Sequence, residues 1–148
     1  MAEDYDLHRK FAVDCFNGTW DLLDKATRTP EEAAKMIHMA HASRYHWGEI
    51  GTPVNFARGD WQISRVYAVL GEGENALKYA KSSLHTCLDH GIGDFDLAFA
   101  YEAAARAFAV LGDANRLNQH LELAREAGEA IAEEDDRQHF LNELATIR

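Results

Sequence analysis

Apolar positions recur at spacings of three and four residues along most of the chain, and this pattern is clearest between residues 97 and 131. Two consecutive apolar faces occupy that stretch, one on each side of Gly112. They consist of Leu97, Tyr101, Ala104, Phe108 and Leu111, followed by Leu117, Leu121, Ala124, Gly128 and Ile131. Such spacing places apolar side chains on one side of an α-helix. Because glycine commonly follows the last residue of a helix, Gly112 predicts a tight turn between two antiparallel helices.

The same design occurs 41 residues earlier in the chain. Residues 65–71 (Arg-Val-Tyr-Ala-Val-Leu-Gly) match residues 106–112 (Arg-Ala-Phe-Ala-Val-Leu-Gly) at five of seven positions. The apolar positions of this earlier pair of helices are Ile63, Val66, Tyr67 and Leu70, then Leu77, Ala80, Leu84, Cys87 and Leu88. A repeated helical hairpin leaves one apolar face uncovered, so tandem copies are expected to stack on each other.

The first 50 residues predict a third, less regular pair of helices. Leu7, Phe11 and Cys15 begin an apolar stripe, and residues 17–18 (Asn-Gly) favour a turn that would divide this helix. A second helix is predicted from residues 29–32 (Thr-Pro-Glu-Glu), which offer a capping residue, a first-turn proline and an acidic first turn.

A last helix is predicted over residues 136–147, where Phe140, Leu141, Leu144 and Ile147 form the apolar side. We expect this helix to cap the open end of the stack. The alternative is a homodimer contact through the first three of these side chains.

The sequence therefore predicts seven helices in one all-α domain spanning residues 1–148. We expect a right-handed stack of antiparallel hairpins over residues 4–50, 52–91 and 93–131, closed by helix 136–147. The composition agrees, since Ala and Leu total 38 residues while Val and Ile total 11. Helices favour the first two residue types and strands the second two.

The charge balance bears on the class of partner. The chain has 25 acidic and 15 basic residues, a formal net charge of -10, which disfavours nucleic acids and anionic membranes as partners. The start of the chain shows no signal-peptide pattern, and no apolar run is long enough to span a membrane. Two isolated cysteines, Cys15 and Cys87, are typical of reduced thiols, so we expect a cytoplasmic protein.

The hairpins resemble tetratricopeptide repeats, in which an aromatic residue lies in the first helix, Leu-Gly at its end and small residues in the second helix. The matching residues are Tyr67, Leu70, Gly71, Ala76 and Ser83, then Phe108, Leu111, Gly112 and Ala124, with Ala33 and Ala40 in the first pair. The repeat of 41 residues is longer than the family's usual ~34, and the closing proline is missing. Parts of the chain also resemble uncharacterised bacterial proteins of the tetratricopeptide type. The resemblance implies a superhelix whose concave groove holds a ligand.

That groove would be lined by the second face of each first helix. Positions off the apolar stripe that share this face are Arg58, Trp61, Arg65, Phe99, Glu102 and Arg106. Two arginines in equivalent repeat positions beside aromatic residues suit a segment that bears carboxylates, either an acidic peptide or a free C-terminal carboxylate. The alternative is that the arginines of residues 65 and 106 pair with Glu102 or Asp60 and stiffen the stack.

Eight histidines raise the alternative of a metal or small-molecule site in a helical bundle. His38 and His41 are one helical turn apart, whereas His46 lies roughly 140° away from the face of His41. Candidates for a third ligand are His8, His120 and His139. The spacing is poor for a chelate, so we expect no metal.

The chain carries no nucleophile elbow, no glycine-rich phosphate loop and no Cys-His dyad. We therefore expect a non-catalytic interaction module without a cofactor, which binds a peptide or protein segment. The alternative is the helical bundle that uses the cluster of His38, His41 and His46.

Overall fold

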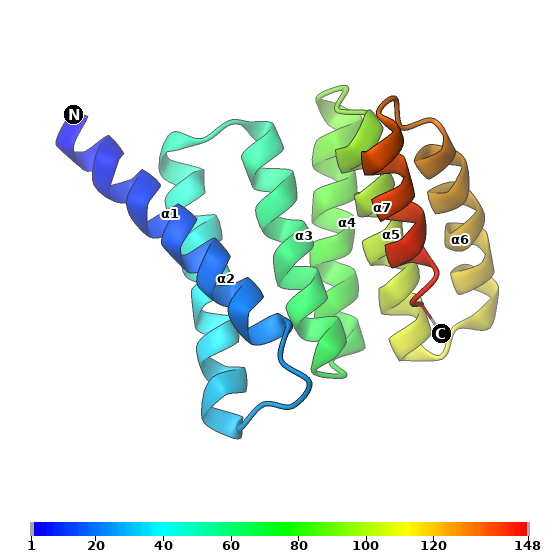
Figure 1. Cartoon of the computed structure of the whole chain (residues 1–148), viewed down its shortest axis with the longest axis horizontal. Coiled ribbons are helices and arrows are strands. Elements are labelled where there is room, and N and C mark those ends of the chain that lie inside the picture. Colours follow the sequence, from blue (N-terminus) through cyan, green and yellow to red (C-terminus); the bar gives the residue numbers. More distant parts are fainter. Residues whose placement is uncertain (1, 148) are drawn as a thin grey trace.

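A computed structural model describes residues 2–147 of the chain, and these residues form seven α-helices and no strand. The helices are α1 (Ala2–Leu23), α2 (Pro30–Ile50), α3 (Pro53–Val69), α4 (Gly73–Asp89), α5 (Asp94–Leu111), α6 (Ala114–Glu129) and α7 (Glu134–Leu144). They run as three antiparallel hairpins that stack in chain order, and α7 then packs on α5 and α6 (Figure 1). The predicted all-α stack of helical hairpins is confirmed.

The 41-residue repeat sets the register of the two central hairpins. α3 begins at Pro53 and α5 at Asp94, and their partners α4 and α6 begin at residues 73 and 114. Both first helices end in a glycine with left-handed backbone, Gly71 at φ 78° and Gly112 at φ 74°. Other residues rarely adopt this conformation, so glycine permits the tight turn within each hairpin.

Alanines allow these helices to approach closely. On α5, the side chains of Ala103, Ala104, Ala105 and Ala107 are all buried. Ala124 of α6 is buried as well. Small side chains bring neighbouring helix axes together, so the stack has little space for larger residues at these positions.

The N-terminal hairpin departs from the sequence prediction in one respect. α1 is a single helix through residues 17–18, so the predicted turn there is wrong. Gly18 instead lies close to α2, where an added Cβ would stand 3.1 Å from Sδ of Met39. The predicted apolar stripe is also shifted, because Leu7 and Phe11 are 52% and 44% exposed while Ala12 is buried.

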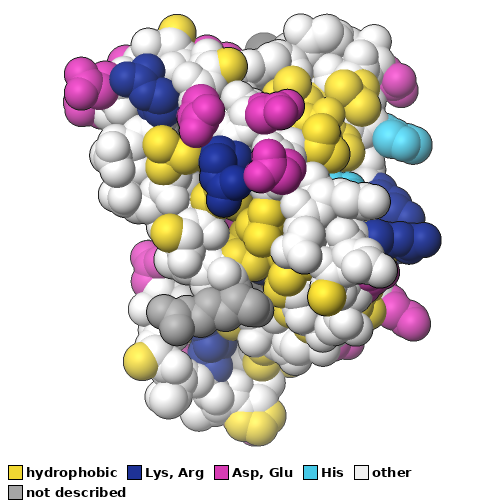
Figure 2. All heavy atoms as spheres, turned by 90° about the vertical axis from the view of Figure 1, so that its right-hand side faces the viewer, with side chains coloured by type: hydrophobic (Ala, Val, Ile, Leu, Met, Phe, Trp, Pro, Cys, Tyr) yellow, Lys and Arg dark blue, Asp and Glu magenta, His cyan; other side chains and the backbone are white. Residues whose placement is uncertain are grey.

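α7 closes the other end of the stack. It begins two residues earlier than predicted, and its Phe140 and Leu144 are buried in a cluster with Ala98, Phe99 and Ala124. The side chains considered for a homodimer therefore pack largely inside the chain. Figure 2 shows this end of the molecule, where charged side chains separate the hydrophobic side chains that reach the surface.

Candidate functional site

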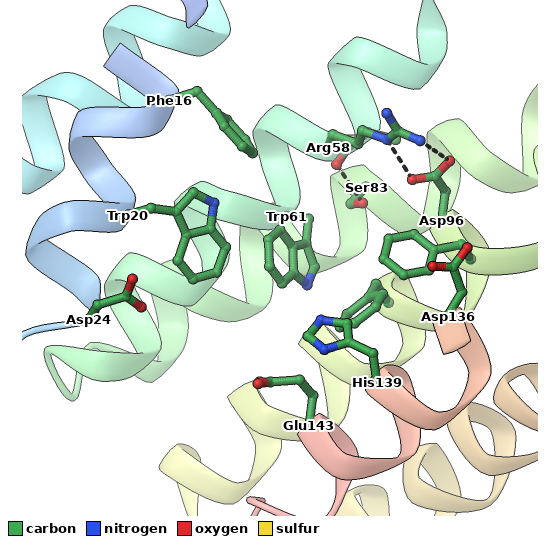
Figure 3. A pocket seen from close by; sticks show the side chains of 13 residues that line it. Phe16, Trp20, Asp24, Arg58, Trp61, Ser83, Asp96, Asp136, His139 and Glu143 are labelled. Atoms are coloured by element: carbon green, nitrogen blue, oxygen red, sulfur yellow. Dashed lines mark hydrogen bonds and ion pairs between the residues drawn. The ribbon is translucent and has the colours of Figure 1, made fainter. Parts of the chain in front are cut away.

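A cleft of about 650 Å³ lies between α1 and α7, and α3 and α5 form its floor (Figure 3). Its volume falls within the range of ordinary ligand pockets, roughly 300–1,000 Å³. The lining residues are Phe16, Trp20, Asp24, Ala57, Arg58, Trp61, Ser83, Phe95, Asp96, Phe99, Asp136, His139 and Glu143. Two lining residues lie outside these four helices: Asp24, which directly follows α1, and Ser83 of α4, whose hydroxyl donates to the Ala57 carbonyl at 2.8 Å.

Each rim of the cleft is one face of one helix. α1 contributes Phe16 and Trp20, and Asp24 follows directly after its last residue, all at intervals of four residues; α7 contributes Asp136 and Glu143 with His139 between them. Residues three and four apart lie on the same side of a helix, so both sets point into the cleft. Figure 3 shows Asp24 beside Trp20 on one rim, and His139 and Glu143 on the other.

Aromatic rings form most of the floor. The Trp61 ring centroid lies 5.6 Å from that of Trp20, at 37° between planes, and 5.4 Å from that of Phe99, at 75°. Phe95 extends the surface, with 4.6 Å between its ring centroid and that of Phe99. Side chains of this kind supply a large contact area at protein interfaces.

Arg58 lies at the mouth of the cleft and is held by a carboxylate. Its Nε and Nη2 donate to the two carboxylate oxygens of Asp96 at 2.8 and 3.2 Å. This hydrogen bonding raises the pKa of the Arg58 guanidinium, which is thus charged and paired with Asp96 while its side chain stays 55% exposed.

Beside the cleft lies an ion cluster, defined here as Glu102, Arg65, Arg106 and Glu143, of which Glu102 is fully buried and Glu143 also lines the cleft. Glu102 is 0% exposed, and its Oε1 accepts from Arg65 at 3.1 Å and from Arg106 at 2.7 Å. Its Oε2 accepts from the Trp61 indole at 3.2 Å. Arg65 also reaches Glu143 at 3.3 Å. Both arginines are therefore neutralised within the chain.

Two of the three rim carboxylates lack such compensation. The ion pairs found within residues 2–147 involve neither Asp24 nor Asp136. Asp136 instead lies close to Glu133, and their repulsion raises the pKa of the Glu133 carboxyl. Negative charge therefore accumulates where α7 meets the cleft.

The six residues predicted for a groove separate into two groups. Arg58, Trp61 and Phe99 line the cleft, whereas the other three, Arg65, Glu102 and Arg106, form the ion cluster. The pairing of both arginines with Glu102, considered above as an alternative, is what the structure shows. Asp60 pairs with Arg44 instead, at 3.1 Å.

Sequence reasoning missed both rims of the cleft. The residues that it did not single out for the groove are Phe16, Trp20, Asp24, Asp136, His139 and Glu143. The available signal was their spacing of three and four residues, which places each set on one helix face. Nothing in the repeat connects the two sets, because α1 and α7 lie outside it.

The histidines of the alternative site are distributed over different contacts. His41 Nε2 lies 2.9 Å from the Tyr67 hydroxyl, and His46 Nδ1 lies 2.9 Å from Nδ1 of His8. His38 is exposed on α2. Within residues 2–147, no three His, Cys, Asp or Glu side chains are grouped to hold a metal ion.

The two thiols are poor nucleophiles in this environment. Burial raises the pKa of the Cys87 thiol to about 11, and it also raises the pKa of Cys15. Because the thiolate is the reactive form, both side chains are chemically quiet near neutral pH.

Comparison of the chain with protein-family models, curated proteins and solved structures finds no match. In the part of the chain that the structure describes, no helix has both the length and the apolar character needed to cross a bilayer.

Proposed function

We propose that the protein is a non-catalytic helical-repeat interaction module, similar in construction to tetratricopeptide proteins, which binds a peptide segment in the cleft between α1 and α7. The observation that carries this proposal is the aromatic lining. Five aromatic side chains from α1, α3 and α5 line a cleft of about 650 Å³; four of them are half-buried, and Phe99 is buried. Pockets lined by aromatic side chains with a few polar groups are typical of binding sites.

The polar groups of the cleft support binding rather than chemistry. The Ser83 hydroxyl is engaged by a backbone carbonyl, and the Arg58 guanidinium by Asp96. A nucleophile needs a base within hydrogen-bond reach, and Ser83 has a carbonyl in that place. The cleft thus offers shape, aromatic surface and charge to a ligand.

The repeat architecture also suits an extended ligand. The floor is built from equivalent faces of α3 and α5, which are one repeat apart, and the two rims run along single helices. A peptide segment can follow such a channel and place side chains against successive rings.

The proposal is tested by selecting binders from a phage-displayed library of random heptapeptides and mapping them by NMR. We expect the indole signals of Trp20 and Trp61 to shift most, and Trp20→Ala to weaken binding roughly tenfold or more, as expected for an aromatic hot spot. Trp47→Ala is the matched control, because Trp47 lies outside the main cleft. Peptides that shift signals elsewhere, or that bind Trp20→Ala as they bind the wild type, would contradict the proposal.

A further inference from the structure

The charges around the cleft are unequally satisfied, and this difference bears on the ligand. Each arginine at or beside the cleft already has a carboxylate partner. Arg58 is paired with Asp96, and Arg65 and Arg106 with the buried Glu102. The side chains of Arg65 and Arg106 are only 12% and 17% exposed, so a carboxylate ligand would have to displace Glu102 to pair with them, which leaves a buried charge unpaired.

The carboxylates of the rims are differently placed. Asp24, directly after α1, and Asp136 on α7 have no ion-pair partner within residues 2–147. Glu143 shares Arg65 with Glu102, and its side chain is still 34% exposed. A cation that enters the cleft therefore meets carboxylates on both sides (Figure 3).

We infer that the segment bound in the cleft is basic, and that it places an arginine or lysine side chain on the aromatic floor between the acidic rims. This inference rests on the proposed function. It replaces the acidic segment expected from the sequence, because the arginines behind that expectation belong to the interior.

The aromatic floor favours a cation as well. The face of an indole ring attracts guanidinium and ammonium groups. Trp61 already shows this behaviour, since the Arg65 guanidinium carbon lies 5.4 Å from its ring centroid. The Trp61 indole is also fixed in orientation, because its N–H donates to Glu102. The alkyl stem of an incoming basic side chain would pack on the neighbouring rings.

The overall charge of the chain acts in the same direction. A formal net charge of -10 attracts basic segments over a distance and repels acidic ones. The rims then provide the local complement. A basic segment is thus favoured by long-range attraction, by carboxylates at the cleft edges and by the aromatic surface between them.

The test uses three synthetic heptapeptide pools that are identical except at two fixed positions, which hold Arg, Gln or Glu. Affinity is measured by calorimetry, and the contact surface by the indole NMR signals. We expect the Arg pool to bind at least roughly tenfold more tightly than the Gln pool, and the Glu pool to bind most weakly. The preference for Arg should shrink as the salt concentration rises.

A charge-matched pair of variants assigns the preference to the rims. Asp24→Asn combined with Asp136→Asn removes two carboxylates from the cleft. The control, Asp21→Asn with Asp135→Asn, makes the same change in net charge at nearby positions of the chain, on exposed residues that do not line the cleft. We expect only the first variant to lose most of the preference for Arg over Gln.

The outcomes separate this inference from the proposed function. Equal binding of all three pools in the cleft, or tightest binding of the Glu pool, would overturn the basic segment and leave peptide binding intact. Equal loss of preference in both double variants would overturn the role of the rims. Free arginine amide that binds as tightly as the Arg pool would show a site for small cations instead. If no pool shifts the signals of Trp20 and Trp61, the proposed function fails and the basic segment fails with it.

Discussion

Two neighbouring regions on the same faces of α3 and α5 differ in whether their charged side chains have partners within the chain. In the ion cluster, Glu102 is fully buried and accepts from Arg65, Arg106 and the Trp61 indole. In the cleft, one helical turn away along α3 and α5, half-buried aromatic rings line an open space, and the rim carboxylates Asp24 and Asp136 have no ion-pair partner among residues 2–147. One region is closed and electrically satisfied, and the other is open and acidic.

The position of α7 explains much of this difference. Its C-terminal end covers the cluster, since Arg106 donates to the Glu143 carbonyl at 3.2 Å and to the Thr146 hydroxyl at 2.8 Å. Its N-terminal half stands back and forms a rim with Asp136 and His139. Equivalent repeat positions therefore acquire different roles when a helix outside the repeat covers some of them.

The largest effect is expected from removing Glu102. In Glu102→Ala, two buried guanidinium groups and an indole N–H lose their shared acceptor. Breaking a buried pair by removing one partner costs about 3–5 kcal/mol, so the free energy of unfolding should fall by that amount. Urea denaturation measures the change.

Glu102→Gln is the matched control for this prediction. The amide oxygen still accepts a hydrogen bond but carries no charge, so its loss of stability should be smaller than that of Glu102→Ala. If Glu102→Ala unfolds at the same urea concentration as the wild type, the ion cluster does not stabilise the fold. The cluster and the cleft would then not differ in the way described.

A second prediction concerns the packing of α7 against α6. Gly128 faces Phe140, and an added Cβ would overlap the phenyl ring. Overpacking of this kind costs about 1–3 kcal/mol, so Gly128→Ala should lower the melting temperature and expose α7 to limited proteolysis. Because α7 forms one rim, peptide binding should weaken as well.

The control for this substitution is Gly48→Ala on the exposed side of α2. A Cβ there would meet only the flexible end of Arg44, 3.1 Å from Nη1. Alanine within a helix stabilises by about 0.4–1 kcal/mol relative to glycine. Equal melting temperatures for the two variants would show that Phe140 is not held against α6 as described.

The sequence predicted the repeated part of the fold well, for a physical reason. Local rules decide the hairpins there, because a proline or aspartate starts each first helix and glycines at 71 and 112 permit the left-handed turns. The turn predicted at residues 17–18 failed because contact with α2 favours a continuous helix over a local glycine signal.

The site was predicted only in part because it joins residues that are far apart in sequence. Trp61 and Phe99 could be found from the repeat, since their helices are 41 residues apart in register. Trp20 and His139 line the same cleft because α1 packs on α2 and α3 while α7 packs on α5 and α6, an arrangement that no periodicity records. The burial of Glu102 depends on α7 as well. The sequence alone therefore left open whether Glu102 lines a groove or pairs with the arginines.

A third prediction concerns His41, a polar side chain that is neither fully buried nor fully exposed. His41 is half-buried against Tyr67 and Tyr79, and burial lowers its pKa below the usual 6.5. The unfolded chain therefore takes up a proton at a higher pH than the folded chain, so stability is lost as the pH falls below about 6.5. Unfolding curves between neutral pH and about pH 5 measure this loss.

His41→Gln provides the reference curve. Burial also lowers the pKa of His46, but that group titrates in both proteins and cancels in the difference. Asp60 acts oppositely, because burial raises its pKa and folding then gains stability on acidification. Parallel curves for the wild type and His41→Gln would show that His41 is not desolvated in the folded protein.

The smallest effect is expected at the rims, where Asp24→Asn with Asp136→Asn should change stability by no more than about 0.5 kcal/mol. Neither carboxylate has an ion-pair partner to lose, and the loss of Asp136 relieves its repulsion of Glu133. The variant should therefore melt at the same temperature as the wild type or slightly above it at about 10 mM salt, and the difference should vanish near about 1 M, where charges are screened. A loss of stability comparable to that of Glu102→Ala would mean that the rim carboxylates hold the fold together. The distinction between a satisfied interior and an acidic surface kept for a ligand would then be lost.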